Sequence, residues 1–276
     1  MAPTELAQCV VIGLGDTDDA LLLSDEAHWN QTAADWAVFM THGECYGIRA
    51  DGRLVASAAI LPFVGGFGWV SMVLVTSDWR RRGLASQLMN RCIGAMRARG
   101  SASLLDATPE GALVYGQLGF QSKCGMSRWR GMGSRSSARP SVSSTAPDRA
   151  AILACDLQVF GGDRGALIED FLDRPGTQVI GDEGNFVLLR AGRRGTQIGP
   201  LVSQSQAEAC ELLESALACI SGSVIIDVLD AGACLEPVLL KHGFKAFRTF
   251  ERMILDRVEL PGMPSRMMVA AGPEFG

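Results

Sequence analysis

At 276 residues, 47% of them hydrophobic and 20% charged, the chain has the composition of a globular protein long enough for two domains. Its net charge of −5 argues against the broad basic face that nucleic-acid binding usually needs, but it permits a small anionic ligand in a local basic site. The eight cysteines include no C-x-x-C pair, and no apolar run approaches the length of a membrane span. We therefore expect buried free thiols, no metal site, no membrane contact and a cytoplasmic location.

The first part of the chain predicts two helices followed by an antiparallel meander. Strands are expected at 9–12, 45–50, 54–61 and 68–75, and helices at 17–23 and 33–40. Asp51-Gly52 is a strong hairpin signal, and Thr32 is a candidate cap for the second helix. A core role and a pocket-wall role both stay open for Trp36.

The stretch from Gly68 to Arg99 predicts a strand, a polar turn and an amphipathic helix, and the rest of the chain is organised around it. Arg80, Arg81, Arg82 and Gly83 occupy the turn. A helix N-terminus carries partial positive charge and disfavours cations, so three arginines there indicate an anion among them. A solvated basic turn is the alternative.

After this helix, a strand at 103–106, a helix that begins at Thr108-Pro109 and a strand at 120–130 are expected to close the first unit. Residues 132–148 are rich in serine and proline and predict a linker. The order of helices, meander and β-α-β-α-β is typical of a mixed α/β layer fold.

The second half repeats the first in outline. Strands are expected at 179–181, 185–191, 197–202, 224–229 and 245–255, and helices at 207–220 and 231–241. Ser203 to Ala209 corresponds in the repeat to the turn with the arginines, but it contains neither arginine nor glycine. Leu239 corresponds in the same way to Tyr115. The repeat thus keeps the predicted architecture but lacks the residues of the anion site.

Two motifs carry a resemblance to the GCN5-related N-acetyltransferases (GNAT). Arg80 to Ala85 resembles the family's (Q/R)-x-x-G-x-(G/A) loop, and Leu113 to Phe120 is similar to its "LYxxxGF" segment. The second half resembles the C-terminal domain of a subset of the family. The resemblance implies tandem GNAT-like α/β folds, each a mixed, mostly antiparallel sheet flanked by helices. The implied domains are 1–131 and 149–276, joined by the linker 132–148.

The resemblance also implies roles for individual residues. Tyr115 is the implied general acid, although Thr108 stands where the family often has asparagine. Asn30 and Trp36 lie where the family builds part of its acceptor pocket, but for Asn30 a helix-capping role is the safer interpretation. Acetyl-CoA is implied to bind the strand end and the loop, which are Val73, Leu74, Val75, Arg80, Arg81, Arg82, Gly83, Leu84, Ala85 and Ser86.

These features favour an acetyl-CoA-dependent N-acetyltransferase that acts on a primary amine of a small molecule or amino-acid-like acceptor. The alternative is a non-catalytic acyl-CoA-binding or regulatory module. The base that takes the amine proton is left open among His42, Glu44, Asp106 and a water relay. We expect no metal, nucleic-acid or membrane partner, and monomer and homodimer both stay open.

Overall fold

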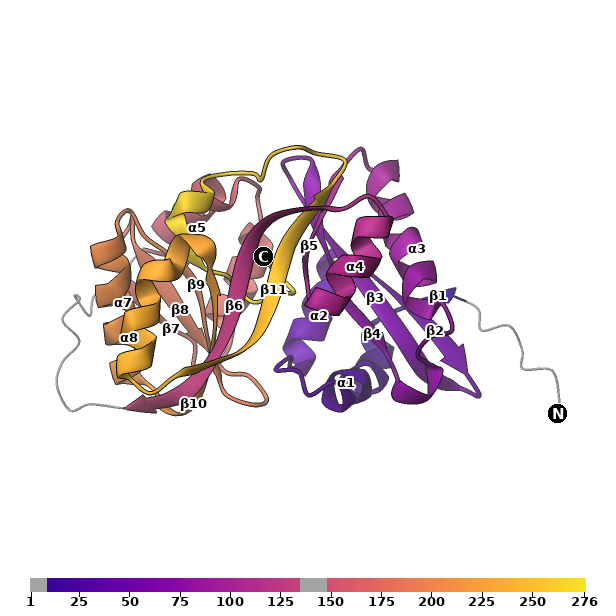
Figure 1. The fold of residues 1–276 in the computed structure, drawn as a ribbon, viewed down its shortest axis with the longest axis horizontal. Helices are drawn as coiled ribbons and strands as arrows, with labels where there is room; N and C mark the ends of the chain where they lie inside the picture. The colour runs from indigo at the N-terminus through magenta and orange to yellow at the C-terminus, as the bar shows by residue number, and fades with distance from the viewer. Residues whose placement is uncertain (1–8, 135–147) are drawn as a thin grey trace. The chain divides into compact units, whose positions relative to one another are not determined.

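A computed structural model describes residues 9–134 and 148–276 of the chain. It shows a mixed α/β fold in which mostly antiparallel strands are accompanied by helices (Figure 1), as the sequence predicts. By internal contacts the chain divides into two compact units, Met1–Leu104 and Leu105–Gly276.

Unit 1 contains a meander whose neighbouring strands β1 to β4 run antiparallel, followed by the first residues of β5, which run parallel to β4. Helices α1 and α2 pack against the meander, and α3 packs against β3 and β4. The elements are β1 (Cys9–Ile12), α1 (Thr17–Glu26), α2 (Ala33–His42), β2 (Glu44–Ala50), β3 (Arg53–Phe63), β4 (Phe67–Val75), α3 (Leu84–Ala98) and β5 (Ala102–Ala107).

Local sequence explains these elements. Asp51 and Gly52 both have positive φ, as the two-residue hairpin turn between β2 and β3 requires. The Thr32 side chain accepts a hydrogen bond from the Asp35 amide, and the Asp35 carboxylate accepts one from the Thr32 amide, which together form a capping box for α2. The predicted apolar face of α3 is buried along its length, at Leu84, Leu88, Met89, Cys92, Ile93 and Met96.

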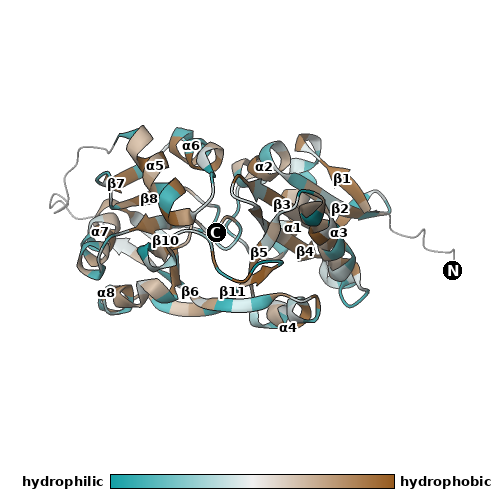
Figure 2. Cartoon of the chain, turned by 90° about the horizontal axis from the view of Figure 1, so that it is seen from above, coloured by the Kyte–Doolittle hydropathy of each residue, from teal (hydrophilic) through white to brown (hydrophobic). Residues whose placement is uncertain are grey.

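Unit 2 contains the strand order β11-β6-β10-β12-β9-β8-β7. Its helices show both teal and brown residues in Figure 2, as in α6, where Leu167, Ile168 and Phe171 are buried. The elements are α4 (Pro109–Gln117), β6 (Gln121–Ser134), α5 (Arg149–Phe160), α6 (Gly165–Asp173), β7 (Gln178–Gly181), β8 (Phe186–Arg190), β9 (Thr196–Val202), α7 (Gln206–Cys219), β10 (Ser221–Leu229), α8 (Glu236–Lys241), β11 (Lys245–Leu255) and β12 (Met267–Val269).

Strand β6 does not close the first unit, and that expectation is wrong. It pairs antiparallel with β10 from Met126–Leu229 to Ser134–Ser221, and with β11 from Gln121–Ile254 to Arg130–Lys245. Figure 1 shows β6 and β11 side by side as two long, bent strands. The last strand of the first repeat is therefore part of the sheet of unit 2.

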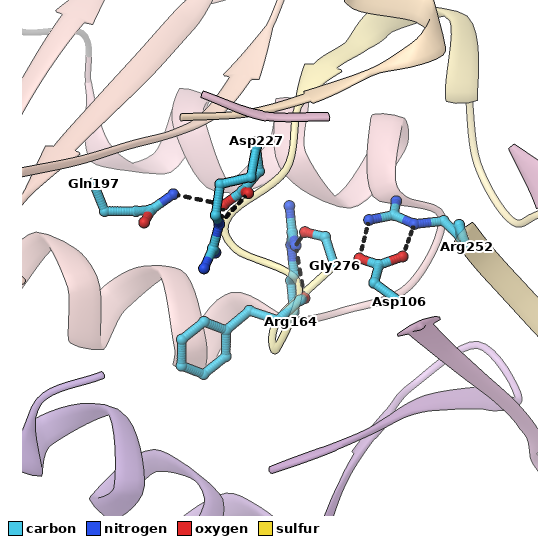
Figure 3. A network of polar contacts seen from close by, with 8 residues as sticks. Asp106, Arg164, Gln197, Asp227, Arg252 and Gly276 are labelled. Atoms are coloured by element: carbon cyan, nitrogen blue, oxygen red, sulfur yellow. Dashed lines mark hydrogen bonds and ion pairs between the residues drawn. The ribbon is translucent and has the colours of Figure 1, made fainter. Parts of the chain in front are cut away.

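Two buried ion pairs accompany this arrangement, and they occupy equivalent positions in the two repeats. Asp106, near the end of β5, forms a two-point pair with Arg252 of β11, with both N–O distances 2.8 Å. Asp227, near the end of β10, forms the matching pair with Arg128 of β6 at 2.6 and 2.9 Å, and it also accepts a hydrogen bond from Gln197. Figure 3 shows both aspartates. Each aspartate thus pairs with an arginine from the last strand of the other repeat.

The predicted linker is partly strand. Residues 132–134 belong to β6, and residues 135–147 lie outside the described part of the chain. Two glycines in this part of the chain are required by close packing. A Cβ on Gly131 would lie 2.3 Å from the Phe244 ring, and a Cβ on Gly133 would lie 2.6 Å from the Ile220 carbonyl oxygen. The domain boundaries 1–131 and 149–276 follow the sequence repeat, and they stay a prediction.

Three further details differ from the sequence prediction, and the first is helix α5, where no helix is expected. The helix expected at 231–241 begins as a 3-10 helix over Asp230–Leu235 and becomes α-helical only from Glu236, beside Pro237. Strand β12 was not predicted.

Candidate active site

Strand β4 carries a one-residue bulge in the middle of the candidate site. Opposite it, β3 advances two residues from Ser57 to Ala59 while β4 covers three, from Leu74 back to Ser71. Met72 has φ 54°, an unusual conformation for a residue with a side chain, and its carbonyl oxygen accepts a hydrogen bond from the Ser57 hydroxyl at 2.8 Å. Met72 and Val73 form the bulge and have no register partner in β3, whereas Leu74 and Val75 pair with Ser57 and Ala56.

The other side of β4 has only a short ladder. Its parallel pairing with β5 covers three positions, from Phe67 with Ala102 to Trp69 with Leu104, and β4 itself continues to Val75. Backbone amide and carbonyl groups at the end of β4 are therefore candidates for contacts to a ligand.

The arginine turn follows β4 directly, through a 3-10 turn at Ser77–Trp79. Arg80 Nε donates to the Val75 carbonyl oxygen at 3.1 Å, and Arg82 Nη2 donates to that of Asp78 at 2.9 Å and lies over the Trp79 ring. All three arginines are exposed. Within residues 9–134 and 148–276, none of them forms an ion pair with a carboxylate, so a local cluster of positive charge is left for a ligand.

Helix α3 begins without a side-chain cap. A Thr or Ser side chain caps α2, α4 and α7, whereas the cap position of α3 is Gly83. Arg81 (φ 61°) and Gly83 (φ 80°) both adopt left-handed conformations, and no atom lies within 4 Å of a Cβ placed on Gly83. The first-turn amides of Leu84, Ala85 and Ser86 are thus approachable by an anion.

Tyr115 lies in unit 2, on α4. Its ring is half-buried and packs against Phe120 with the ring centroids 6.2 Å apart. Thr108 caps this helix through its hydroxyl, which accepts from the Gly111 amide at 3.2 Å. The residue that departs from the family's usual asparagine therefore has a clear structural role here.

The residues expected at the acceptor pocket are both buried. Asn30 is 6% exposed and Trp36 is fully buried, with its indole Nε1 donating to the Ser24 hydroxyl at 2.9 Å. Of the two roles left open for Trp36, this placement favours the core.

The candidate bases differ in environment. Asp106 is fully buried against Arg252, and burial raises the pKa of its carboxyl. The hydrogen bond from the Tyr46 hydroxyl, together with Arg99, lowers the pKa of Glu44. His42 is exposed at the end of α2. Asp106 is committed to its ion pair, and a lowered pKa makes Glu44 a weaker base.

Unit 2 also has a cavity of about 340 Å³, lined by residues from α5, the β7–β8 turn and the start of α7. Arg266 lines it, and its guanidinium donates to the Gly184 carbonyl oxygen at 2.8 Å, so this charge already holds a neighbouring loop. Cys155 lines it as well, and burial raises the pKa of that thiol.

Comparison with known proteins identifies the family. Residues 17–120 match the model of the acetyltransferase (GNAT) family, and residues 152–267 match a second acetyltransferase (GNAT) domain model. The protein therefore belongs to the GNAT acetyltransferases and carries two GNAT domains in tandem, as the resemblance implies.

Individual relatives agree with this assignment. The uncharacterized N-acetyltransferase YitH of Bacillus subtilis (strain 168) is 23% identical over 81% of this chain and 83% of its own length. A Pyrococcus horikoshii protein assigned to the acetyltransferases has the same fold, with a TM-score of 0.82 over 99% of this chain and 96% of its own, at 17% identity. A tandem GNAT protein from the clavulanic acid biosynthesis pathway gives a TM-score of 0.64 over 90% and 98% of the two chains, at 14% identity.

Two further observations concern all of the described residues. None of the helices combines the length and apolar character that a membrane span needs. No group of three or more His, Cys, Asp or Glu side chains in residues 9–134 and 148–276 is placed to hold a metal ion.

The sequence did not reveal the bulge or its hydrogen bond. The available signal was Ser57, a polar residue inside the apolar run of β3 that is completely buried. A buried hydroxyl needs a partner, and here the partner is the carbonyl group of the bulged residue.

Proposed function

We propose that this GNAT acetyltransferase moves an acetyl group from acetyl-CoA to the primary amine of a small-molecule or amino-acid-like acceptor. The observation that carries the proposal is the uncapped start of α3, where exposed arginines and approachable amides surround Gly83. This combination fits the pyrophosphate of coenzyme A, because both the charge and the amide donors suit an oxyanion.

The loop geometry supports a phosphate at this position. Gly83 is left-handed and has open space around it, so a phosphate oxygen can approach the backbone without meeting a side chain. Hydrogen bonds to the carbonyl oxygens of Val75 and Asp78 hold the Arg80 and Arg82 side chains in place. From there the two guanidinium groups are proposed to contact the pyrophosphate.

Strand β4 is proposed to hold the reacting end of the co-substrate. Acetyl-CoA supplies the thioester carbonyl group, which needs a hydrogen-bond donor as negative charge develops on its oxygen. Backbone amides in the stretch Val73 to Val75 suit this task because β4 continues to Val75, beyond the last position, Trp69 with Leu104, at which it pairs with β5.

Tyr115 is proposed to give a proton to the departing thiolate sulfur of coenzyme A. It is a half-buried phenol on a short helix, and the second repeat has Leu239 at the equivalent position. The acceptor nitrogen forms the new C–N bond as the C–S bond breaks. Its own proton is proposed to leave through water, because Asp106 is already paired with Arg252.

Release of free thiol from acetyl-CoA tests this proposal. A panel of small amines and amino acids, added one at a time with a thiol-specific reagent, should contain at least one that gives steady turnover and an acetylated product by mass spectrometry. Tight acetyl-CoA binding without thiol release for any amine, peptide or polyamine would instead support the non-catalytic module.

A further inference from the structure

Strands β9 and β10 of unit 2 are parallel neighbours for part of their length and then separate. They pair from Thr196 with Val224 to Ile198 with Ile226. Beyond this point β12 lies between them and runs antiparallel to both, pairing Val269 with Val228 on one side and with Leu201 on the other. A segment from far along the chain therefore occupies the space between two strands.

Main-chain hydrogen bonds hold this segment from both sides. The Ala270 amide donates to the Asp227 carbonyl oxygen of β10 at 2.9 Å, and the Ser203 amide at the end of β9 donates to the Arg266 carbonyl oxygen at 3.0 Å. Such bonds recognise an extended backbone whatever its side chains are, as in β-strand addition.

Side-chain packing and side-chain hydrogen bonds also keep this segment in place. Val269 and Phe275 are fully buried, and the Phe275 ring packs edge-on against Phe171 with the centroids 5.2 Å apart. The buried Arg164, itself paired with Asp156, donates to the backbone oxygens of Phe275 at 3.1 Å and Gly276 at 2.7 Å (Figure 3).

Strand β9 allows the backbone of this segment to approach its own backbone closely. β9 has a one-residue bulge at Gly199, as β4 has at Met72, and Gly199 has φ 135°. A Cβ on Gly199 would lie only 2.0 Å from the Ala270 carbonyl oxygen. On the other side, a Cβ on Gly232 would lie 2.3 Å from the Met268 carbonyl oxygen, so both contacts depend on glycine.

We propose that the space between β9 and β10 is a groove for an extended peptide, and that segment Met267–Gly276 of this chain is its resident ligand. The groove binds main chain on both edges and buries each of the five side chains from Met267 to Ala271. Its position beside the bulge of β9 corresponds to the bulged end of β4, where the proposed function places the thioester. Unit 2 consequently holds its own chain in this groove and takes up no acetyl-CoA there.

Hydrogen exchange on the full-length protein tests the proposal. The Ala270 amide should exchange at least about 1,000-fold more slowly than in an unstructured peptide, because it opens only with unit 2. Gly199→Ala should speed its exchange by about tenfold or more by pushing on the Ala270 carbonyl group. The matched control is Gly222→Ala, which imposes the same kind of strain (φ 100°) where no atom lies within 4 Å, and it should leave Ala270 unaffected.

Fast exchange of Ala270 in the unaltered protein, or equal effects of the two variants, would overturn the proposal. If Gly199→Ala fails to fold, Phe275→Ala removes an anchor instead and should give the same local acceleration. Saturating acetyl-CoA should slow exchange at Arg81–Ser86 and leave Ala270 unchanged. Loss of the first effect contradicts the proposed function alone, whereas a change at Ala270 contradicts the resident peptide.

Discussion

Gly83 combines two properties that no other residue type supplies together, a left-handed backbone and an open approach to the start of α3. Gly83→Glu should abolish acetyl-CoA binding in calorimetry, because the new carboxylate repels the pyrophosphate and blocks the amides. Gln206→Glu, at the start of the corresponding helix α7, is the matched control and should bind with unchanged affinity. Similar losses in both variants would contradict a site confined to the first loop.

The proposed role of Tyr115 as the general acid can be tested by removing its hydroxyl group. Tyr115→Phe keeps the ring against Phe120 but removes the hydroxyl, so kcat should fall by roughly 10- to 10,000-fold, the range of general acid catalysis. The Kd for acetyl-CoA should change little. An unchanged kcat, measured where the chemical step limits the rate, would exclude Tyr115 as the acid.

Glu44 links the stability of unit 1 to pH. Its pKa is lowered in the folded protein, first by the hydrogen bond from Tyr46 and then by Arg99. The stabilisation is therefore complete above the unfolded pKa of about 4.3 and is lost as the pH falls through the lower, folded value. Urea unfolding between about pH 6 and pH 3 should show a steeper loss for the natural protein than for Glu44→Gln. Parallel pH profiles would show that the Tyr46 and Arg99 contacts do not contribute.

At the residue scale, the sequence predicts the local structure of the arginine turn but not the environment of Trp36. Arg80 to Gly83 are predicted to form a turn because they lie directly between an apolar strand and an amphipathic helix, and the structure has the turn at this place. Trp36 is ambiguous because an aromatic residue on a short helix can face either the core or a pocket. Its burial depends on the contact with Ser24 of a different helix, which no local pattern encodes.

At the element scale, the two aspartate–arginine pairs connect strands that are distant in sequence. Asp227→Ala should lower the free energy of unfolding by about 3–5 kcal/mol, because it leaves Arg128 buried without its partner. Asp227→Leu combined with Arg128→Met should recover most of this loss. The measurement is denaturant unfolding of each variant.

An exposed pair is the control for this prediction. In Arg149–Asp173 the side chains are 49% and 67% exposed, so Asp173→Ala should leave the free energy of unfolding almost unchanged. Equal losses for Asp227→Ala and Asp173→Ala would contradict a special role for the buried pair.

The elements themselves were largely predictable, but their partners were not. The sequence predicts β6 and β11 as two strands, yet nothing local indicates that they pair with each other, because pairing is a property of the sheet. The last residues of β6, 132–134, belong to the serine- and proline-rich stretch that predicts a linker, and only their pairing with β10 shows that they are strand. β12 is three residues long, too short for any period to show.

At the scale of the whole molecule, the sequence repeat and the compact units have different boundaries. The repeat predicts a boundary near Gly131, whereas the contact division falls after Leu104 and assigns β6 to unit 2. A fragment 1–131 should therefore be less soluble than a fragment 1–107, because it carries β6 without β10 and β11. Light scattering and yield after expression measure this. A monomeric, soluble 1–131 fragment would show that β6 has a partner within the first repeat.

The pairing of β6 also affects how the protein is made. β6 ends at Ser134, but its partner β11 ends only at Leu255, so the ribosome must add about 120 residues before that edge can be covered. At roughly 5–20 residues per second, this takes about 6–24 seconds. During this time the edge of β6 that faces β11 stays unpaired in the nascent chain, so a chaperone that binds extended strands is expected to contact residues 121–134 in the growing chain more than in the finished protein.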